Sequence, residues 1–546
     1  MPKFNYIITA SSADGPLSIA GSVSSAWENG SDDFRYVILK AEPEVPACTL
    51  ESISAILPLQ MDEDEWVYMN GFQAWSYSPE LDKKGKTRGI NGLPKFGINY
   101  FGLDKYADYH FRSYPNKPGI TQGYSYCYFR SGDSFRLIAS LDEVPGYTQF
   151  RYEANLNKLT IERDCAGIRA EGRYKAFDLY FAEGSEKDVF DGWFAALGLP
   201  TPKAEPIFGY TSWYNRYENI FEECILNDLA GAAKVLTPGD LFQIDDGWEP
   251  AVGDWLEGDP AKFPAGMKDM ADRIHQEGFK AGLWLAPFVA CEKSEVYKKH
   301  PQWFYFHDSK PWRCGCNWGG FYALDMDHPE VQDYLRQVFH RVFDEWGYDL
   351  VKLDFLYAAA PFGDEKETRA ARMIRAMKFL RELCGDKLII GCGVPLMPTF
   401  GLVDYCRISC DVSLDWDDVP LHRIANRERI STKQAIHNAV FRRELDGRAF
   451  GSDPDVFYLR DDNLKLTPEQ KKLLAINCAL FGTVHFCSDD MNDFTDIKKD
   501  AWNHLREISK AQDVRVHHEK NEKGEESFRV NYRLGGSEYT YDIPLK

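Results

Sequence analysis

The chain has 546 residues, 84 of them acidic and 64 basic, so its formal net charge is −20. This charge argues against a general nucleic-acid or anionic-membrane binder, because both partners require basic patches. The opening residues lack an apolar core and no run approaches the ~18 apolar residues of a membrane span, so we expect no secretory signal and no anchor. The 13 cysteines are odd in number and scattered, which favours a reduced, cytoplasmic protein over a disulfide scaffold.

Short β-rich runs separated by Gly, Asp, Asn and Pro occupy the first ~180 residues, a pattern typical of an antiparallel sandwich. The runs are 36–40, 124–129, 135–140, 147–152 and 158–162. An amphipathic helix then ends at Gly198. Three prolines within 199–206 predict a linker after it.

From residue 207, short apolar runs ending in polar residues alternate with helical patterns such as MKDMADRIHQEG. The eight runs are IFGYTSWYN, LFQIDDGW, AGLWLAPF, LVKLDF, LIIGCGVP, VDYCRISCD, AFGSDPD and TVHFCSDD. Eight such runs with crossover helices predict a parallel (β/α)8 barrel. An open doubly wound sheet is the competing fold, but no GxGxxG or Walker loop follows a strand.

The last ~40 residues contain two β-rich runs around Gly535-Gly536, which predicts a hairpin or small β domain. We therefore expect an N-terminal antiparallel β-sandwich over 1–200, a catalytic barrel over 201–506 and a short β domain over 507–546.

Active sites of such barrels lie at the carboxyl ends of the strands. Carboxylates dominate the ends of the eight runs, with a few cations and aromatic residues. These residues are Trp213, Tyr214, Asp245, Asp246, Trp284, Lys352, Asp354, Cys392, Arg407, Asp411, Asp453, Asp455, Asp489 and Asp490.

Other reaction classes lack their signatures. HExxH and GxSxG are missing, and Cys314-Gly-Cys316 has no second thiol pair for a zinc site. Paired carboxylates with aromatic residues are the groups that glycoside hydrolysis uses, one as nucleophile and one as proton donor. We expect no metal and no other cofactor, because two carboxylates suffice.

Asp354 is the candidate nucleophile. Lys352 lies two residues earlier and so on the same strand face, where its ammonium would keep Asp354 ionised. A structural ion pair inside the barrel is the alternative reading.

Asp411, four residues after Arg407, is the candidate acid, since partial burial or a nearby carboxylate would keep it protonated. Its alternative is a loop or helix-capping aspartate. Asp415, Asp417 and Asp418 are rivals, although SLDWDD is more typical of the start of the next helix.

The adjacent pair Asp245-Asp246 suits a grip on neighbouring sugar hydroxyls, but Asp-Asp-Gly is also an ordinary turn.

These motifs, together with NGFQAWSYS at 70–78, resemble those of the α-galactosidases of glycoside hydrolase family 36. The resemblance covers the barrel end to end and extends into the β-rich front. It implies a β-supersandwich, a (β/α)8 barrel, a C-terminal β domain and a retaining mechanism. Phe72 departs from it where many members carry Trp, and Leu356-Tyr357 departs where many carry Asn.

Residue roles follow from the same resemblance. It implies Asp354 as nucleophile and Asp411 as acid/base, with Asp245 and Asp246 holding galactose hydroxyls. It further implies sugar contacts from Lys352 and Arg407, a pocket wall at Trp284, a residue beside the nucleophile at Tyr214 and a pocket rim at Trp75. Cys392 and Asp453 complete the candidate substrate-binding residues.

The resemblance implies an exo-acting α-galactosidase on melibiose- or raffinose-type oligosaccharides. An α-N-acetylgalactosaminidase and a galactosyl transferase are the alternatives on the same scaffold. A carbohydrate-binding protein on an inactive barrel is disfavoured because both catalytic aspartates are present. A phosphate-handling barrel enzyme is disfavoured because SDPDVF and SDDMND are acidic. The oligomeric state stays open.

Overall fold

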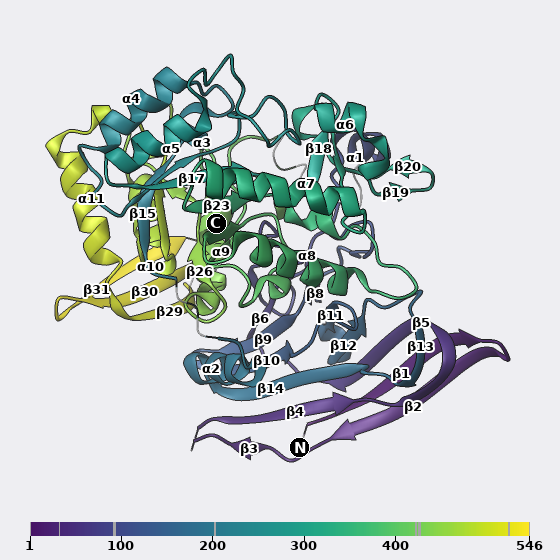
Figure 1. Ribbon diagram of the computed structural model, residues 1–546. Helices are drawn as coiled ribbons and strands as arrows, with labels where there is room; N and C mark the ends of the chain where they lie inside the picture. The colour runs from purple at the N-terminus through teal and green to yellow at the C-terminus, as the bar shows by residue number, and fades with distance from the viewer. Residues whose placement is uncertain are drawn as a thin grey trace.

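The computed structural model describes residues 2–31, 33–90, 94–200, 202, 204–420, 423, 427–521 and 525–544. Two antiparallel sheets form the N-terminal part, at the bottom of Figure 1. One contains β1 (Lys3–Ser12), β2 (Gly15–Ser24), β5 (Glu44–Pro58), β8 (Ile120–Tyr124), β11 (Thr148–Glu153), β12 (Lys158–Arg163) and β13 (Arg169–Arg173). The other contains β3 (Glu28–Asn29), β4 (Arg35–Ala41), β6 (Trp66–Met69), β7 (Glu80–Leu81), β9 (Tyr126–Ser131), β10 (Ser134–Ser140) and β14 (Phe177–Ser185).

The two sheets share a core because their strands alternate between buried and exposed side chains. Alternate residues of β4 and β12 are buried, as the period of two along a strand requires. The five predicted runs fall on strands, except that 124–129 spans two of them. Ser125, at φ +65°, separates β8 from β9.

The helix predicted before the linker is present as α2 (Glu186–Leu197). The Ser185 hydroxyl accepts from the Asp188 N–H at its start, and Gly198 ends it in the left-handed conformation. The linker predicted at 199–206 lies partly outside the described residues.

A curled parallel sheet forms the centre of the molecule, and each of the eight predicted runs contributes to it. Its strands are β15 (Ile207–Thr211), β16 (Leu241–Ile244), β17 (Lys280–Leu285), β23 (Leu350–Leu353), β24 (Leu388–Gly391), β25 (Tyr405–Arg407), β26 (Gly451–Asp453), β27 (Val456–Phe457) and β28 (Val484–Cys487). The two ends of the sheet, β26 and β27, are separated in sequence only by Pro454 and Asp455. The seventh predicted run, 449–455, contains β26, which pairs with β25, and β27 follows directly after this run and pairs with β28.

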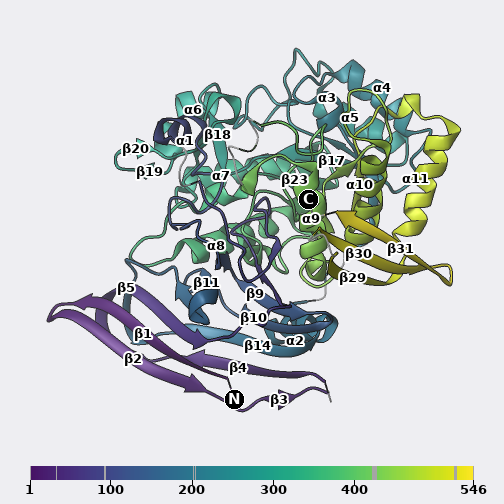
Figure 2. The same ribbon diagram turned by 180° about the vertical axis from the view of Figure 1, so that it is seen from behind.

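Helices connect the strands and surround the parallel sheet in both views of the ribbon (Figures 1 and 2). They are α3 (Trp213–Arg216), α4 (Glu222–Ala232), α5 (Gly266–Gln276), α7 (Pro329–His340), α8 (Arg369–Cys384), α9 (Thr432–Phe441), α10 (Pro468–Phe481) and α11 (Asp496–Ile508). A longer excursion after β17 carries β18 (Val289–Cys291), α6 (Glu295–Lys299), β19 (Phe306–His307), β20 (Lys310–Pro311), β21 (Arg313–Gly315) and β22 (Phe321–Ala323). A further short helix, α1 (Lys95–Phe101), lies in the front part of the chain.

Two expectations about helices were wrong. The described chain between β24 and β25 contains only a 3-10 turn, Met397–Thr399, in place of a crossover helix. SLDWDD does not begin a helix. The helix α9 starts later, at Thr432, with Ser431 as its N-cap. Asp417 pairs instead with Arg429, at 2.7 Å.

The C-terminal hairpin is present and gains a third strand. Its strands are β29 (Gln512–Lys520), β30 (Glu526–Leu534) and β31 (Ser537–Pro544). It joins the front sheets through buried Glu80, whose carboxylate lies 3.1 Å from Arg130 and 2.9 Å from His518. Burial opposes the charge of Glu80, but these two partners lower its pKa to about 2.

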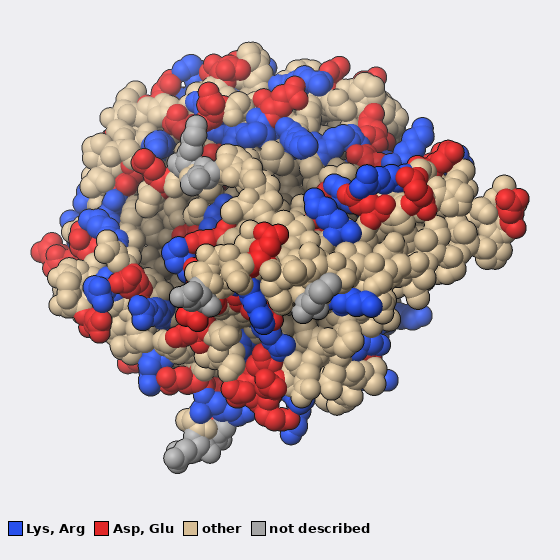
Figure 3. All heavy atoms as spheres, turned by 90° about the horizontal axis from the view of Figure 1, so that it is seen from below, with Lys and Arg blue, Asp and Glu red and all other residues tan. Residues whose placement is uncertain are grey.

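No helix of the described residues combines the length and apolarity needed to cross a bilayer. On the face drawn in Figure 3, acidic and basic side chains are interspersed and no broad basic field is present.

One buried cation fastens the front loop 70–78 to the parallel sheet. The guanidinium of Arg442 is fully buried and donates to the Gln73 carbonyl at 3.2 Å, the Ser76 carbonyl at 3.1 Å and the Ala74 carbonyl. It also donates to the Ile408 carbonyl, 2.7 Å away, just beyond β25. Each such bond to a charged donor contributes about 1.5–3 kcal/mol, and a buried carbonyl left without a donor adds a penalty.

We therefore expect Arg442→Met to lower stability by about 3 kcal/mol or more. The measurement is the first unfolding transition in urea, since a chain with several units need not unfold in one step. Arg529→Met, at a half-exposed ion pair on β30, is the control and should cost under about 1 kcal/mol. Equal losses for the two variants would contradict the anchoring role.

Candidate active site

A cavity of about 350 Å³ opens at the carboxyl ends of the parallel strands. This volume lies at the lower end of the usual range for small-molecule sites. Its walls come from the front loop and the segment around Tyr106, from five strand ends, from the excursion after β17 and from the loop that precedes α9. The lining residues are Trp75, Leu103, Tyr106, Trp213, Glu218, Asp245, Asp246, Trp284, Cys316, Asn317, Trp318, Lys352, Asp354, Phe355, Cys410, Asp411, Glu428, Arg429 and Ile430.

Strand register brings three of these side chains together. Trp284 of β17 is aligned with Lys352 of β23, so the two lie side by side on neighbouring strands. The N–H of Asp354 continues the pairing by donating to the Leu285 carbonyl at 2.8 Å. Because parallel strands end at one edge of the sheet, all three side chains reach the same cavity.

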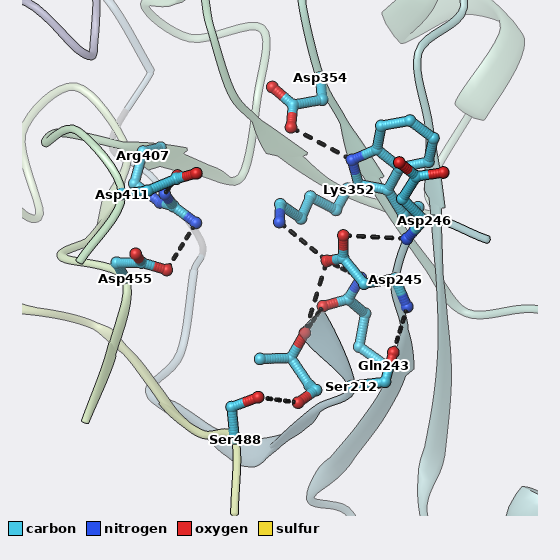
Figure 4. A network of polar contacts seen from close by, with 12 residues as sticks. Ser212, Gln243, Asp245, Asp246, Lys352, Asp354, Arg407, Asp411, Asp455 and Ser488 are labelled. Atoms are coloured by element: carbon cyan, nitrogen blue, oxygen red, sulfur yellow. Dashed lines mark hydrogen bonds and ion pairs between the residues drawn. The ribbon is translucent and has the colours of Figure 1, made fainter. Parts of the chain in front are cut away.

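The Asp354 carboxylate is held by two donors. The indole N–H of Trp284 donates to Oδ2 at 3.1 Å and the N–H of Phe355 donates to Oδ1 at 2.8 Å (Figure 4). Burial raises the pKa of Asp354, while Lys352 and the hydrogen bonds from Cys392 and Trp284 lower it in part and Asp411 raises it further. We expected Lys352 to keep Asp354 ionised. Its charge acts in that direction, but burial outweighs it.

The partner of Lys352 is Asp245. Its ammonium lies 2.8 Å from Oδ2 of Asp245, and both side chains are buried. Burial alone would lower the pKa of Lys352, but Asp245 more than offsets this and the pKa rises. Gln243 donates to the same Asp245 oxygen at 3.0 Å, and the Ser212 hydroxyl accepts the Asp245 N–H at 2.9 Å. The carboxylate is therefore fixed in place by a buried network (Figure 4).

Asp246 has a different electrostatic environment from its neighbour. Its Oδ2 accepts from the indole N–H of Trp318 at 2.9 Å. Burial and the nearby carboxyl of Glu249 raise its pKa far above the usual range. The pKa of Glu249 is raised as well, chiefly by burial. Both shifts favour a proton on this pair.

Arg407 lies opposite this group and binds three carboxylates. Its guanidinium lies 2.8 Å from Asp411, 3.2 Å from Asp453 and 2.8 Å from Asp455. Asp411 is the accessible one, with 36% of its side chain exposed, whereas Asp453 and Asp455 are buried at 1%. Figure 4 shows Arg407, Asp411 and Asp455 on one side of the site and Asp245, Asp246 and Lys352 on the other.

Seven of the eleven candidate residues line the cavity and four lie behind its surface. The lining seven are Asp354, Asp411, Asp245, Asp246, Lys352, Trp284 and Trp75. The other four, all buried, are Arg407, Tyr214, Cys392 and Asp453. Tyr214 was expected beside Asp354, but its hydroxyl donates to Asp455 on the other side of the site. Arg407, expected to contact the sugar, lies 2.8 Å from Asp411 and does not line the cavity.

Several lining residues were missed by the sequence analysis. Trp318 and Asn317 belong to the excursion after β17, and Glu428 and Arg429 belong to the loop before α9. Neither segment ends a strand, so the strand-end rule could not select them. Cys314-Gly-Cys316, considered for a metal, contributes one lining thiol. No group of three or more metal-binding side chains occurs within the described ranges.

Trp75 closes one wall of the cavity from the front loop. Its ring packs against Phe355, with ring centres 5.2 Å apart, and against Tyr357 at 6.0 Å. Gly393 makes this possible, since a methyl group there would lie 2.7 Å from the indole ring. Phe72, Leu356 and Tyr357 do not line the cavity, so the two departures from the family motifs lie outside its surface.

Carboxylates and aromatic side chains at the carboxyl ends of a parallel sheet define a site of the glycoside hydrolase type. Comparison with known proteins agrees. Residues 202–380 match the Melibiase family model. The resemblance to α-galactosidases that the motifs indicated is thereby confirmed over this part of the chain.

The α-galactosidase Mel36A of Lactobacillus acidophilus is 32% identical over 141 residues, which is 24% of this chain and 19% of that protein. A Flavonifractor plautii protein named A type blood α-D-galactosamine galactosaminidase is 34% identical over 125 residues, or 21% of this chain and 11% of its own length. The chain thus spans less than a fifth of these two curated relatives. Among solved structures, the Thermus thermophilus α-galactosidase TtGalA in complex with p-nitrophenyl α-D-galactopyranoside has a TM-score of 0.71 and 26% identity. That match covers 92% of this chain and 97% of the other.

Trp75→Ala should lower kcat/KM by about tenfold or more, because the variant opens one wall of the cavity. Circular dichroism should show an unchanged fold. Trp66→Ala removes an indole of the same front sheets that stacks on His518 at 3.5 Å and does not line the cavity. This control should keep wild-type kinetics. Wild-type kinetics for Trp75→Ala would remove the front loop from the site.

The pair of Asp246 and Glu249 makes stability depend on pH. A buried acid whose folded pKa is raised binds more protons when folded, so stability falls as pH rises above its unfolded pKa of about 4. Glu249→Gln removes the like charge and should weaken this fall. The thermal midpoint of the variant minus that of the wild type should therefore increase from pH 5 to pH 8, by an amount equivalent to about 1.4 kcal/mol or more. A difference in midpoint that stays constant over this range would contradict the shared proton.

Proposed function

We propose that the chain is a retaining exo-α-galactosidase that removes terminal α-linked galactose from melibiose- or raffinose-type oligosaccharides. The observation that carries the proposal is that Asp354 and Asp411 face one small cavity with different partners. Asp354 accepts from Trp284 and a backbone N–H, and Asp411 accepts from Arg407. A structure of the similar Thermus enzyme holds stachyose, which supports an oligosaccharide as substrate.

The proposed architecture follows the sequence prediction. Residues 1–200 would form a β-supersandwich, 201–506 a (β/α)8 barrel and 507–546 a small β domain. The separation of β26 from β27 by only Pro454 and Asp455 supports closure of the barrel. Segments from all three units contact loop 70–78 or its surroundings, so we expect the units to act as one catalytic body.

Chemistry begins with Asp354 as nucleophile on the anomeric carbon. Its two hydrogen-bond donors and the charge of Lys352 favour the ionised form that attack requires, against the opposing effect of burial. Asp411 protonates the leaving oxygen and then, as a base, takes a proton from the incoming water. Its greater exposure suits a group that must reach first the leaving group and then water.

Asp245 and Asp246 hold the galactose hydroxyls. Asp245 is ion-paired and offers acceptor oxygens, whereas the pair of Asp246 and Glu249 keeps a proton and so can donate as well. Lys352 supplies a charged donor on the same side, and Trp284 and Trp75 supply walls. Arg407, Tyr214, Cys392 and Asp453 act from behind these lining residues.

An α-N-acetylgalactosaminidase and a galactosyl transferase remain alternatives on this scaffold. The similarity to the Flavonifractor protein supports the first. A panel of nitrophenyl glycosides tests the first alternative, because the proposed enzyme prefers α-galactoside over α-N-acetylgalactosaminide. A transferase would release less free galactose than nitrophenol, since the galactose passes to an acceptor sugar. The cytoplasmic location stays a prediction from cysteine usage.

Azide rescue should separate the two catalytic roles. With 2,4-dinitrophenyl α-galactoside, Asp354→Ala cannot form the covalent intermediate, so azide attacks directly and gives the β-azide. Asp411→Ala still forms the intermediate but lacks its base, a loss of about 10²–10⁴-fold, and azide should restore turnover as the α-azide. Proton NMR reads the configuration of each product.

The matched control is Asp417→Ala, a rival aspartate that pairs with Arg429 and does not line the cavity. It should show neither form of rescue. An α-azide from Asp354→Ala with a β-azide from Asp411→Ala would reverse the two roles. Release of β-galactose as first product by the wild type would contradict the retaining mechanism.

A further inference from the structure

Behind Asp411 lies a buried carboxyl whose position the proposed reaction does not yet explain. Asp455 lies between β26 and β27, in the two-residue break where the ends of the parallel sheet meet. Its side chain is 1% exposed and does not line the cavity, so it cannot touch the substrate. Two of its contacts, with Arg407 and with the N–H of Val412, lie beside Asp411.

Asp455 binds the chain on both sides of the Asp411 carboxylate. Its Oδ2 accepts the N–H of Val412, the residue after Asp411, at 2.8 Å. Its Oδ1 lies 2.8 Å from Nη2 of Arg407, the guanidinium whose Nη1 donates to Asp411 at 2.8 Å. One carboxyl group therefore fixes the backbone beside Asp411 and the cation that orients its side chain (Figure 4).

The backbone at Asp455 is strained in a way that fits this task. Its φ of +82° lies in the left-handed region, which residues other than glycine rarely adopt. Such a conformation costs about 1–3 kcal/mol and persists only where the surrounding contacts impose it. Besides Arg407 and Val412, these contacts include the Tyr214 hydroxyl, which donates to Oδ2, and Asp453, which accepts the Asp455 N–H at 2.8 Å.

We propose that Asp455 is a positioning residue that holds the carboxyl of Asp411 where it must protonate the leaving oxygen. This inference rests on the proposed function and extends it to a residue that never contacts the sugar. Burial raises the pKa of Asp455 to about 7, with Arg407 opposing and Asp411 and Asp453 adding to the rise. Arg407 thus offsets part of the repulsion among the three carboxyls that surround it.

A positioning role has a kinetic signature that a purely structural role lacks. Misplacing Asp411 weakens protonation of the leaving group, so the loss should grow with the leaving group's need for a proton. The sugar hydroxyl that leaves raffinose needs a proton from the enzyme, whereas 2,4-dinitrophenolate leaves without one. The ratio kcat/KM reports the steps through glycosylation and so isolates this effect from the later attack of water.

The test is Asp455→Asn, assayed for kcat/KM on raffinose and on 2,4-dinitrophenyl α-galactoside. We expect a loss of about tenfold or more on raffinose and of less than about threefold on the dinitrophenyl substrate. Asp489→Asn is the matched control. Asp489 is an equally buried carboxyl after the neighbouring strand β28, and it accepts from the N–H groups of Leu459 and Arg460. In this control variant, kcat/KM should change by the same factor on both substrates.

Equal losses on the two substrates for Asp455→Asn, or no loss on either, would overturn the proposal. Tyr214→Phe provides a second, milder variant if Asp455→Asn does not fold, since it removes only one donor to Asp455. It should also lower kcat/KM more on raffinose than on the dinitrophenyl substrate. An equal loss on both would again contradict the positioning role. A wild type inactive on both α-galactosides would refute the proposed function itself.

Discussion

A buried guanidinium that bonds to neutral groups holds the active region together. Arg442 is fully buried, and within the described part of the chain it donates to backbone carbonyls, the Ser78 hydroxyl and the Asn70 amide oxygen. It joins the front loop that carries Trp75 to Ile408, which follows Arg407 at the end of β25. One cation therefore links the loop that carries the aromatic wall to the strand end on the Asp411 side of the cavity.

Within the cavity, one residue type takes several electrostatic forms. Asp245 is paired with a buried ammonium, the pKa values of Asp246 and Glu249 are both raised, and Asp411 shares a guanidinium with two other carboxyls. Local partners, not residue type, thus set the electrostatic state of each aspartate. For the proposed double displacement, these aspartates would supply the groups of both steps from a cavity lined by more acidic than basic side chains.

Much of this architecture was predictable because it depends on local pattern. The eight apolar runs, the stop at Gly198 and the Gly535-Gly536 hairpin follow from periodicity and turn chemistry, and all are present. Strand ends also selected the four lining aspartates, since the edge of a parallel sheet is a property of each strand. What failed depends on contacts between distant segments. The pairing of Lys352 with Asp245 crosses 107 residues, and no local pattern distinguishes it from pairing with Asp354.

The same limit explains the missed walls of the cavity. Trp318 and Glu428 lie on connections whose path is decided by tertiary packing, not by the period of their own residues. Asp455 was visible as a strand-end residue, but its role depends on the meeting of β26 and β27 around the whole sheet. Its left-handed backbone is likewise imposed by its partners, because Asp-Pro-Asp carries no glycine to indicate it.

The Arg442 anchor also has a consequence for the order of events during synthesis. Its bond to Ser78 joins residues 364 positions apart. At about 5–20 residues per second, a ribosome needs roughly 20–70 s to add that length. For that interval the front sheets can fold while the carbonyls of loop 70–78 still await their donor. The loop therefore emerges exposed, and the nascent chain gains a complete cavity only when α9 and the residues after it leave the ribosome.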